Sequence, residues 1–274
     1  MARARHAYYT AKGSPFYGRA LMLARLPRVA SRRDPTSRAL ARALRRAALK
    51  RVSGAERQWM DRVDARRREL IADETSVAPG FDAKPGTAPE WITRGRGDPI
   101  PIGGVACLFS APPRWGMFLL QLVRELAPES CLELGTGVGI STAYQAAALE
   151  LNGSGTLTTL EGAQAWAEIA EQGLSSLGLA ERARVEVGPI DETLADVMAR
   201  VAPIDYAYLD ADHTEEATVG HFEAIVPHLS EGGIVILDDI SYSGEMWRAW
   251  SAIKRHSRVS LDLALGRMGV VAVS

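Results

Sequence analysis

Short apolar runs alternate with helical patterns from about residue 105 onwards. The runs that predict strands are Ser130–Leu134, Thr156–Leu160, Arg184–Val187, Tyr206–Leu209, Ile234–Leu237, Val259–Leu265 and Gly269–Val273. Strands separated by helix-length segments favour a parallel sheet with helices on both faces. Only the turn Gly266-Arg267-Met268 joins the last two runs, and it is too short for a parallel crossover. We therefore expect an α/β fold with a doubly wound, mainly parallel seven-stranded sheet and an antiparallel last strand.

Helical spacing also marks the N-terminal part of the chain. Pro35 suits the start of a first helix, whose apolar positions recur at helical spacing: Leu40, Leu44, Ala47 and Ala48. Ser53-Gly54-Ala55-Glu56 has the form of a capping box, and a second helix should run from it to about Asp73. The following Pro- and Gly-rich stretch reads as a connecting segment. We divide the chain into a basic helical extension (1–75), a connecting segment (76–104) and a main domain (105–274).

Composition describes an ordinary globular protein. The chain has 274 residues, of which 47% are hydrophobic and 24% charged. No apolar run approaches the roughly 20 residues that span a bilayer, and no secretory signal pattern is visible. The two cysteines, Cys107 and Cys131, form no disulfide or metal pattern. We expect a cytoplasmic protein without a membrane partner.

The net charge of −1 hides a strong asymmetry. Residues 1–70 contain 19 Lys and Arg against 5 Asp and Glu, whereas the remainder contains 13 against 28. The favoured explanation is that the basic helices pack on the acidic body of the same chain or of a partner subunit in a homodimer. The paired apolar stripes of residues 35–73 suggest helices that mediate dimerisation or cover the active site. Nucleic-acid binding and an organelle transit peptide are the alternatives.

A glycine-rich loop follows the first predicted strand. Gly135-Thr136-Gly137-Val138-Gly139 precedes a helix that should begin near Ser141, and its glycines allow a tight turn close to a ligand. The dinucleotide fingerprint requires glycine at position 140, which is Ile140 here. Glu133 completes the pattern E-x-G-x-G-x-G, which is typical of S-adenosylmethionine sites. The sequence thus predicts S-adenosylmethionine bound by Glu133, Gly135, Thr136, Gly137, Gly139 and Ser141.

More cofactor residues are expected where the next strands end. A carboxylate at Glu161 can accept hydrogen bonds from both ribose hydroxyls, although it is also explained as a solvated strand-end residue. The turn after the third strand should line the adenine, or is an ordinary turn. The predicted cofactor-binding set here is Glu161, Gly188, Pro189, Ile190, Asp210 and Asp212.

Acidic residues follow the fourth and fifth predicted strands. Asp210 ends one, and Asp238 and Asp239 end the other. If these strands are neighbours, about 4.8 Å apart, the three carboxylates converge at the edge where doubly wound sheets bind ligands. Such carboxylates repel one another unless a cation lies among them, and oxygen ligands favour Mg²⁺. The alternative is that some of them cap helices or bind the cofactor.

Two segments around these aspartates carry a family resemblance. Residues 205–213 (DYAYLDADH) and 232–239 (GGIVILDD) resemble the cation-dependent O-methyltransferases, which include caffeoyl-CoA, catechol and bacterial natural-product enzymes. The likeness covers roughly residues 105–274 and implies a class I, Rossmann-like methyltransferase with metal ligands at Asp210, Asp238 and Asp239. Histidine at position 213 is familiar in the natural-product branch, whereas the caffeoyl-CoA enzymes have lysine. Asp239 replaces the asparagine of the plant and catechol enzymes.

The function expected from these residues is S-adenosylmethionine-dependent O-methylation of a phenolic or sugar hydroxyl on a small molecule, assisted by Mg²⁺ or a similar divalent cation. His213 and Asp210 are the predicted catalytic residues, with His213 as general base or as a residue that orients Asp210 or caps the next helix. Tyr242, Trp247 and Trp250 wall the acceptor pocket or pack in the core, and His221 and His228 are expected on the surface. The alternatives are an RNA methyltransferase, a metal-independent histidine-based enzyme and a non-catalytic cofactor-binding protein.

Overall fold

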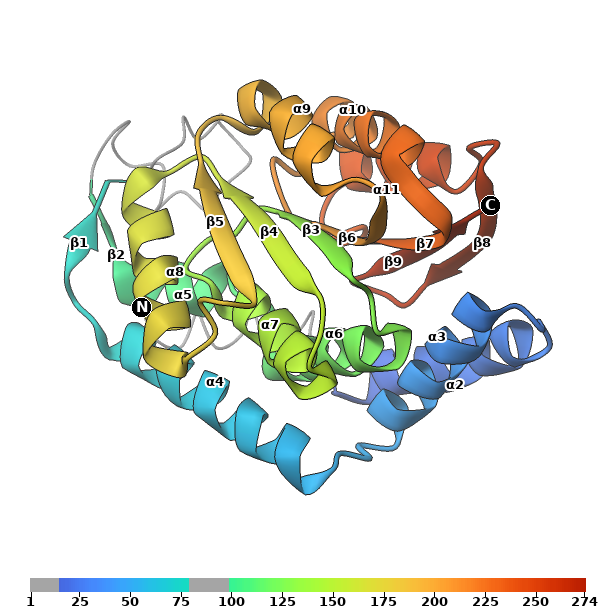
Figure 1. The fold of residues 1–274 in the computed structure, drawn as a ribbon, viewed down its shortest axis with the longest axis horizontal. Coiled ribbons are helices and arrows are strands. Elements are labelled where there is room, and N and C mark those ends of the chain that lie inside the picture. The colour runs from blue at the N-terminus through green and yellow to red at the C-terminus, as the bar shows by residue number, and fades with distance from the viewer. Residues whose placement is uncertain (1–14, 79–98) are drawn as a thin grey trace.

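A central sheet organises the structure, which is a computed structural model that describes residues 15–78 and 99–274 (Figure 1). The sheet has seven strands in the order β5-β4-β3-β6-β7-β9-β8. Their bounds are β3 (Ser130–Leu134), β4 (Thr156–Glu161), β5 (Ala183–Val187), β6 (Ile204–Leu209), β7 (Leu229–Leu237), β8 (Val259–Ala264) and β9 (Gly269–Val273). Neighbouring strands from β5 to β7 pair in parallel, whereas β9 is antiparallel to both β7 and β8. The predicted α/β fold is confirmed.

The strand order reverses at β3, which pairs with β4 on one side and with β6 on the other. In a doubly wound sheet this reversal separates the loops that follow the two central strands and opens a ligand crevice at their carboxyl ends. The glycine loop follows β3 and Asp210 follows β6. Both predicted halves of the site therefore begin at this crevice.

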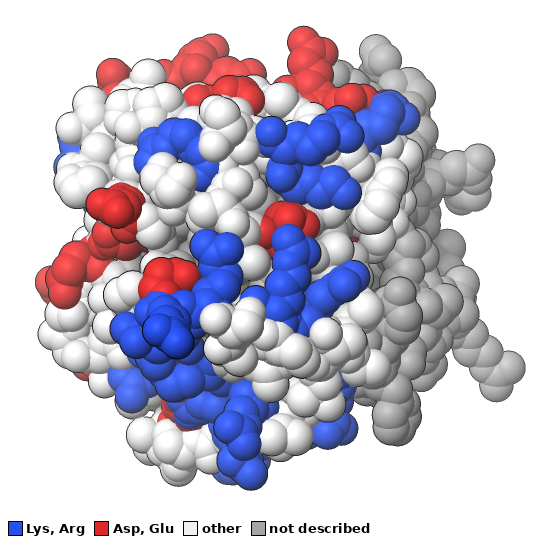
Figure 2. Space-filling model, turned by 90° about the vertical axis from the view of Figure 1, so that its right-hand side faces the viewer, with Lys and Arg blue, Asp and Glu red and all other residues white. Residues whose placement is uncertain are grey.

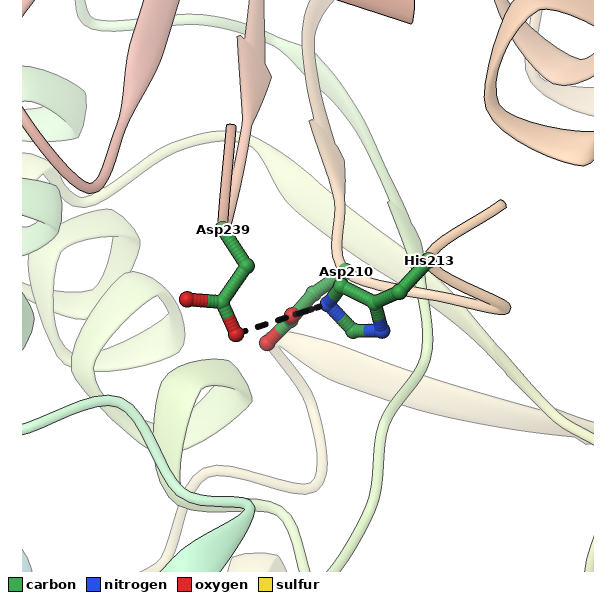
Figure 3. A group of neighbouring side chains, drawn as sticks. All are labelled: Asp210, His213 and Asp239. Atoms are coloured by element: carbon green, nitrogen blue, oxygen red, sulfur yellow. Dashed lines mark ion pairs between the residues drawn. The ribbon is translucent and has the colours of Figure 1, made fainter. Parts of the chain in front are cut away.

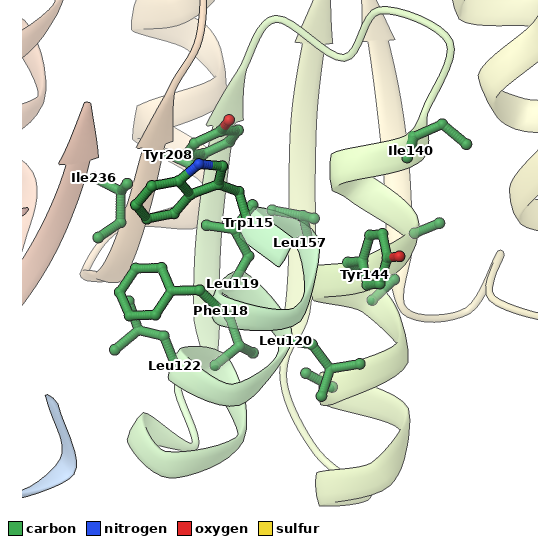
Figure 4. Packing of buried hydrophobic residues seen from close by; sticks show 14 of the residues in the cluster. Trp115, Phe118, Leu119, Leu120, Leu122, Ile140, Tyr144, Leu157, Tyr208 and Ile236 are labelled. Atoms are coloured by element: carbon green, nitrogen blue, oxygen red, sulfur yellow. The ribbon is translucent and has the colours of Figure 1, made fainter. Parts of the chain in front are cut away.

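Helices cover both faces of the sheet. One face carries α9 (Ile190–Val201), α10 (Glu215–Ile225), the short η1 (Val226–His228) and α11 (Gly244–Ile253), and the other carries α5 (Ile102–Leu108), α6 (Pro113–Leu126), α7 (Ile140–Asn152) and α8 (Gln164–Leu177) (Figure 1). Alternate residues of one strand enter different cores: Tyr206 and Tyr208 pack with α6 and α7, whereas Ala207 and Leu209 pack with α9 and α10. Figure 4 shows Trp115 and Phe118 of α6 in the first of these cores.

Three helices precede this unit: α2 (Pro15–Ala30), α3 (Pro35–Ala48) and α4 (Gly54–Ala72). Asp34 caps α3 by accepting from the Ser37 amide, and the capping box of Ser53 and Glu56 begins α4 as the sequence predicted. The apolar stripe of α3 is buried against α6 and α2, in the same core as Leu119 and Leu120. The part of the predicted dimer surface that α3 contributes is thus covered within the chain, whereas Ile71 of α4 is exposed.

Two stretches differ from the expected pattern. The sequence predicted no helix before Pro35, but α2 forms there with Pro27 inside it and buries Met22 and Val29. In the expected connecting segment, β1 (Ser76–Val77) pairs with β2 (Ile100–Pro101), and α5 already begins at Ile102. The rest of that segment, residues 79–98, lies outside the described residues.

Basic side chains of the N-terminal helices contact acidic residues of the main unit. Arg28 pairs with Asp262 of β8 at 2.9 Å, and Arg42 and Arg46 pair with Glu125 of α6 at 2.6 and 2.8 Å. Other arginines remain exposed, and Figure 2 shows Lys and Arg gathered on this face. Packing of the basic helices on the acidic body thus occurs within one chain. No helix in the described parts is long and apolar enough to cross a membrane.

Candidate active site

The glycine loop has a backbone that needs glycine for two different reasons. Gly135, Gly137 and Gly139 have φ values of 91°, 54° and 81°, in the left-handed region. A Cβ atom at Gly135 would lie 2.3 Å from the Asp210 carbonyl oxygen, and one at Gly139 would lie 2.9 Å from the Ala170 Cβ. At Gly137 a Cβ atom would meet nothing within 4 Å. The outer two glycines permit packing, and the middle one leaves open space above the backbone, which fits a cofactor cradle.

Glu161 ends β4 beside this loop. The side chain is 8% exposed. Its Oε2 accepts the Gly137 amide at 2.7 Å and its Oε1 accepts the Ala163 amide at 2.9 Å. Burial raises the pKa of Glu161, against the lowering effect of these backbone donors. Glu161, which the sequence predicted to bind the ribose, therefore lies beside the loop and accepts a hydrogen bond from its middle glycine.

Three residues of the predicted cofactor set are buried in and around the loop. Glu133 is fully buried and accepts hydrogen bonds from Thr142 at 2.6 Å and Gln145 at 2.8 Å, both in α7. Burial raises the pKa of Glu133 to about 7. Thr136 shares a 2.7 Å hydroxyl contact with Thr159, and Ser141 is also buried. In this geometry the motif glutamate joins β3 to α7 below the loop, through partners that the sequence did not single out.

The turn after β5 lies next to the loop. Gly188 donates its amide to the Glu161 carbonyl at 3.0 Å, and Pro189 and Ile190 begin α9. Exposed Asp191 lies 3.2 Å from the Nε2 atom of His221, which Asp212 approaches at 4.0 Å. His221 is 4% exposed, so its predicted surface position is wrong: it lies on the side of α10 that faces Leu194 and Met198 of α9. His228 is half-buried.

A second group of side chains gathers where β6 and β7 end. His213 Nε2 lies 3.2 Å from Asp210 Oδ1 and 3.6 Å from Asp239 Oδ2 (Figure 3). The backbone is left-handed at Asp212, His213 and Asp239, with φ values of 59°, 48° and 51°. Non-glycine residues are uncommon in this region, although Asp and His adopt it more readily than most, and such residues cluster at functional sites. Thr214, rather than His213, caps α10.

Asp238 lies apart from this group. It is fully buried, and Arg267 in the turn between β8 and β9 donates to its two oxygens at 2.6 and 3.0 Å. The Tyr208 hydroxyl also contacts it at 2.5 Å, and contacts Asp210 at 3.2 Å. Burial alone would raise the pKa of Asp238, but Arg267 and the other donors outweigh it and lower that pKa. The sequence identified Arg267 only as a turn residue.

The side chains do not fit the predicted Mg²⁺ site of Asp210, Asp238 and Asp239. Arg267 engages both oxygens of Asp238 and lies 3.4 Å from Asp239 Oδ2. Among the described residues, donor atoms converge within 4.8 Å at Asp210, His213 and Asp239, a set in which an imidazole replaces one carboxylate. Mg²⁺ prefers oxygen donors, and the nearby guanidinium opposes a second cation. After burial, the charge of Arg267 is also what lowers the pKa of Arg114, at the start of α6.

The imidazole of His213 is tuned by its carboxylate neighbours. Burial alone would lower its pKa, but Asp210 next to it, with the charges of Asp239 and Asp238, raises the pKa to about 9. The Tyr242 ring stands 5.9 Å from the imidazole, centroid to centroid. Trp250 is buried in the core and Trp247 is exposed. Of the three predicted wall aromatics, the structure brings only Tyr242 to His213.

Comparisons with known proteins agree with this geometry. Residues 132–240 match the family model described as "Methyltransferase domain". A catechol O-methyltransferase from Mycobacterium tuberculosis is 30% identical over 129 residues, which are 47% of this chain and 56% of that protein. The chain therefore spans little more than half the length of this relative.

Solved structures share the fold. An O-methyltransferase from Bacillus cereus, solved in complex with SAH, is 25% identical to this chain with a TM-score of 0.52. The match includes 61% of this chain and 83% of the Bacillus cereus chain. An SAH-bound methyltransferase from Podospora anserina is 17% identical with a TM-score of 0.55, covers 79% and 96%, and supports the fold alone. With the strand order and the glycine loop, these matches confirm the resemblance of this chain to the class I S-adenosylmethionine-dependent O-methyltransferases.

Proposed function

We propose that this chain is an S-adenosylmethionine-dependent O-methyltransferase that acts on a phenolic or sugar hydroxyl of a small molecule. The observation that carries the proposal is the backbone contact between the two halves of the site: Gly135 of the glycine loop lies against Asp210, which adjoins His213. A cofactor held by the loop and an acceptor held beside His213 would meet at one crevice. The similarity to a catechol O-methyltransferase favours a phenolic acceptor.

The residues of this chain would hold the cofactor at the open backbone of Gly137, at Glu161 and at the turn from Gly188 to Asp191, with Asp212 nearby. Bound S-adenosylmethionine supplies a methyl group already activated on a sulfonium. The protein must then orient the acceptor oxygen in line with that methyl group and accept its proton. Orientation of two partners contributes ~7–11 kcal/mol in favourable cases.

His213 is the proposed general base. Its Nε2 faces Asp210 and Asp239, which stabilise the imidazolium that forms when the base takes the acceptor proton. A cationic ligand at the glycine loop would repel that proton and favour the neutral imidazole that a base requires. Because the side chains do not fit the predicted Mg²⁺ site, the metal-independent, histidine-based alternative is the form of the function that we propose. Cation dependence stays a prediction of the sequence.

The position of the exposed arginines favours a small acceptor over RNA. Arg38, Arg42 and Arg45 are exposed on α3. This helix contacts Gly232 through Thr36 and pairs with Glu125 near the end of α6. Gly232 precedes Leu237 by five strand positions, so this contact lies about 17 Å from the Asp238 end of β7. The basic surface thus lies toward the edge of the sheet opposite to the crevice.

The test is methylation of an acceptor panel. The full chain would be incubated with S-adenosylmethionine and with catechols, other phenols and sugars, with EDTA or with Mg²⁺, and products would be identified by mass spectrometry. We expect a singly methylated product that is absent from a Gly137→Leu variant. Tight cofactor binding without turnover of any acceptor in either condition would instead identify a non-catalytic binding protein. Light scattering of the same preparation tests the predicted homodimer.

A further inference from the structure

The acidic cluster forms a closed ring of contacts. Arg267 binds Asp238 through two bonds, Tyr208 connects Asp238 with Asp210, and His213 lies between Asp210 and Asp239. Asp239 returns to Arg267 at 3.4 Å. One permanent cation therefore contacts two of the three carboxylates directly and the third through a single tyrosine.

Arg267 has the features expected of a built-in counter-ion. Its side chain is 20% exposed, and its partner Asp238 is fully buried. A guanidinium keeps its charge at every physiological pH and matches a carboxylate in a planar, bidentate arrangement. A buried carboxylate without a partner is strongly destabilising, so this pair is a fixed part of the site and not a surface contact of little energy.

Sheet geometry brings the arginine to this position. The register of β7 and β9 places Gly269 opposite Leu237, so the preceding turn lies beside Asp238. The Ile240 amide also donates to the Arg267 carbonyl at 2.9 Å, which ties the turn to the segment that follows β7. The guanidinium is therefore held by its own backbone as well as by the aspartates.

We propose that Arg267 is a positioning residue that takes the place of a divalent cation in this cluster, neutralising Asp238 and Asp239 and thereby holding Asp210 and Asp239 on either side of His213. Two consequences follow. The natural protein has no divalent cation among these aspartates when it works. Removing the guanidinium while keeping the fold leaves Asp238 and Asp239 without their counter-ion beside Asp210, and carboxylate oxygens are the donors that Mg²⁺ and Mn²⁺ prefer.

Titration calorimetry of the full chain with MgCl₂ and MnCl₂ tests the first consequence without needing any acceptor. We expect no cation uptake at this cluster in the natural protein and uptake by Arg267→Gln. Arg267→Lys keeps one positive charge but loses the bidentate geometry, so it should also take up no cation. The matched control is Arg258→Gln, immediately before β8, because Arg258 donates to the backbone carbonyls of Val226 and Ser274 and to no carboxylate of the cluster. It should behave like the natural protein.

The rate of methyl transfer supplies a second readout, and this arm alone rests on the proposed function. Turnover by the natural protein should be unchanged by EDTA. Turnover by Arg267→Gln should be slower by roughly 10- to 100-fold and should be partly restored by Mg²⁺. The turnover rate of Arg267→Lys should lie between those of the natural protein and Arg267→Gln and should not respond to Mg²⁺.

Three results would overturn the proposal: cation uptake by the natural protein that Asp238→Asn abolishes, loss of its turnover in EDTA, or an Arg267→Gln variant that binds no cation and keeps full activity. If circular dichroism shows that Arg267→Gln does not fold, the natural protein and Arg267→Lys still decide, since cation uptake by either contradicts the proposal. Absence of turnover in every preparation, with the calorimetric result as expected, would refute the proposed function and leave the assignment of Arg267 standing.

Discussion

Gly135 and Asp210 lie so close that a Cβ atom on the glycine would stand 2.3 Å from the aspartate carbonyl oxygen. The Asp210 amide also donates to the Leu134 carbonyl at 2.9 Å, so the ends of β3 and β6 are joined immediately before both loops diverge. The cofactor side and the acceptor side of the crevice thus share one backbone junction. Their separation is set by the sheet and not by the mobility of either loop.

Gly135→Ala should therefore destabilise the protein far more than its backbone conformation alone requires. A left-handed φ costs about 1–3 kcal/mol for a non-glycine residue, and the clash with backbone adds to it. Gly153→Ala is the matched control, because Gly153 has a similar φ of 76° with nothing within 4 Å of its Cβ position. Urea denaturation should show that Gly135→Ala lowers the free energy of unfolding at least twice as much as Gly153→Ala does. Equal losses would mean that the junction yields easily.

Cofactor affinity should depend on Gly137 and Glu161. A leucine side chain at Gly137 would fill the space above the loop, and Glu161→Gln would remove a charged acceptor, a change of roughly 10- to 100-fold in affinity. Gly178→Leu is the control, since Gly178 also has a positive φ and nothing within 4 Å but ends α8. All three variants should melt at a lower temperature than the natural protein. Calorimetry should show weaker binding of S-adenosylmethionine by Gly137→Leu and Glu161→Gln and unchanged binding by Gly178→Leu. Unchanged affinity in both loop variants would refute the cradle.

Glu133 should make stability depend on pH. Its pKa is raised from 4.5 to about 7 by burial, so the folded state favours the protonated form. Stability from this group is complete below pH 4.5 and is lost as pH rises through 7, a change of about 3 kcal/mol. Urea denaturation should be carried out across this window on the natural protein and on Glu133→Gln. The free energy of unfolding of the natural protein should fall relative to that of the variant as pH rises. A constant difference would contradict the raised pKa.

His213→Ala should abolish most turnover without affecting cofactor binding. Loss of a general base typically costs ~10²–10⁴-fold in rate, and added Mg²⁺ should not repair it. His228→Ala is a suitable control because His228 is half-buried in η1, away from the aspartates. The comparison needs only the rate and the affinity for S-adenosylmethionine. Full activity of the His213 variant would leave the histidine an orienting role at most.

The strands were predictable because their chemistry is local. Apolar runs such as Ser130–Leu134 predict a buried strand, and the glycines at 135, 137 and 139 directly indicate the turn that follows. Helix α2 could not be predicted in this way, because its arginines and Pro27 interrupt the apolar pattern and few positions, Met22 and Val29 among them, pack inward. Its burial depends on helices that are distant in the sequence.

The partners of the aspartates show the limit of sequence reasoning at the site. Convergence of Asp210 with Asp239 follows from adjacent parallel strands. The pairing of Asp238 with Arg267 depends on β9 lying between β7 and β8, whereas a hairpin pattern predicts only that the last two strands are antiparallel. His221 is similar, because its contact with Asp191 requires α9 to lie beside α10. Long-range order, rather than residue type, decides both.

The left-handed backbone at Asp212, His213 and Asp239 has a consequence for engineering. Glycine at these positions would relieve backbone strain of at most about 1–3 kcal/mol each, so a search for thermostable variants would select glycine at these three residues early. Two of them carry the imidazole and one of the carboxylates of the proposed acceptor site. Stabilised libraries of this protein should therefore show an inverse relation between melting temperature and turnover that is concentrated at these few positions, and directed evolution for heat tolerance is better aimed at the exposed faces of α3 and α4.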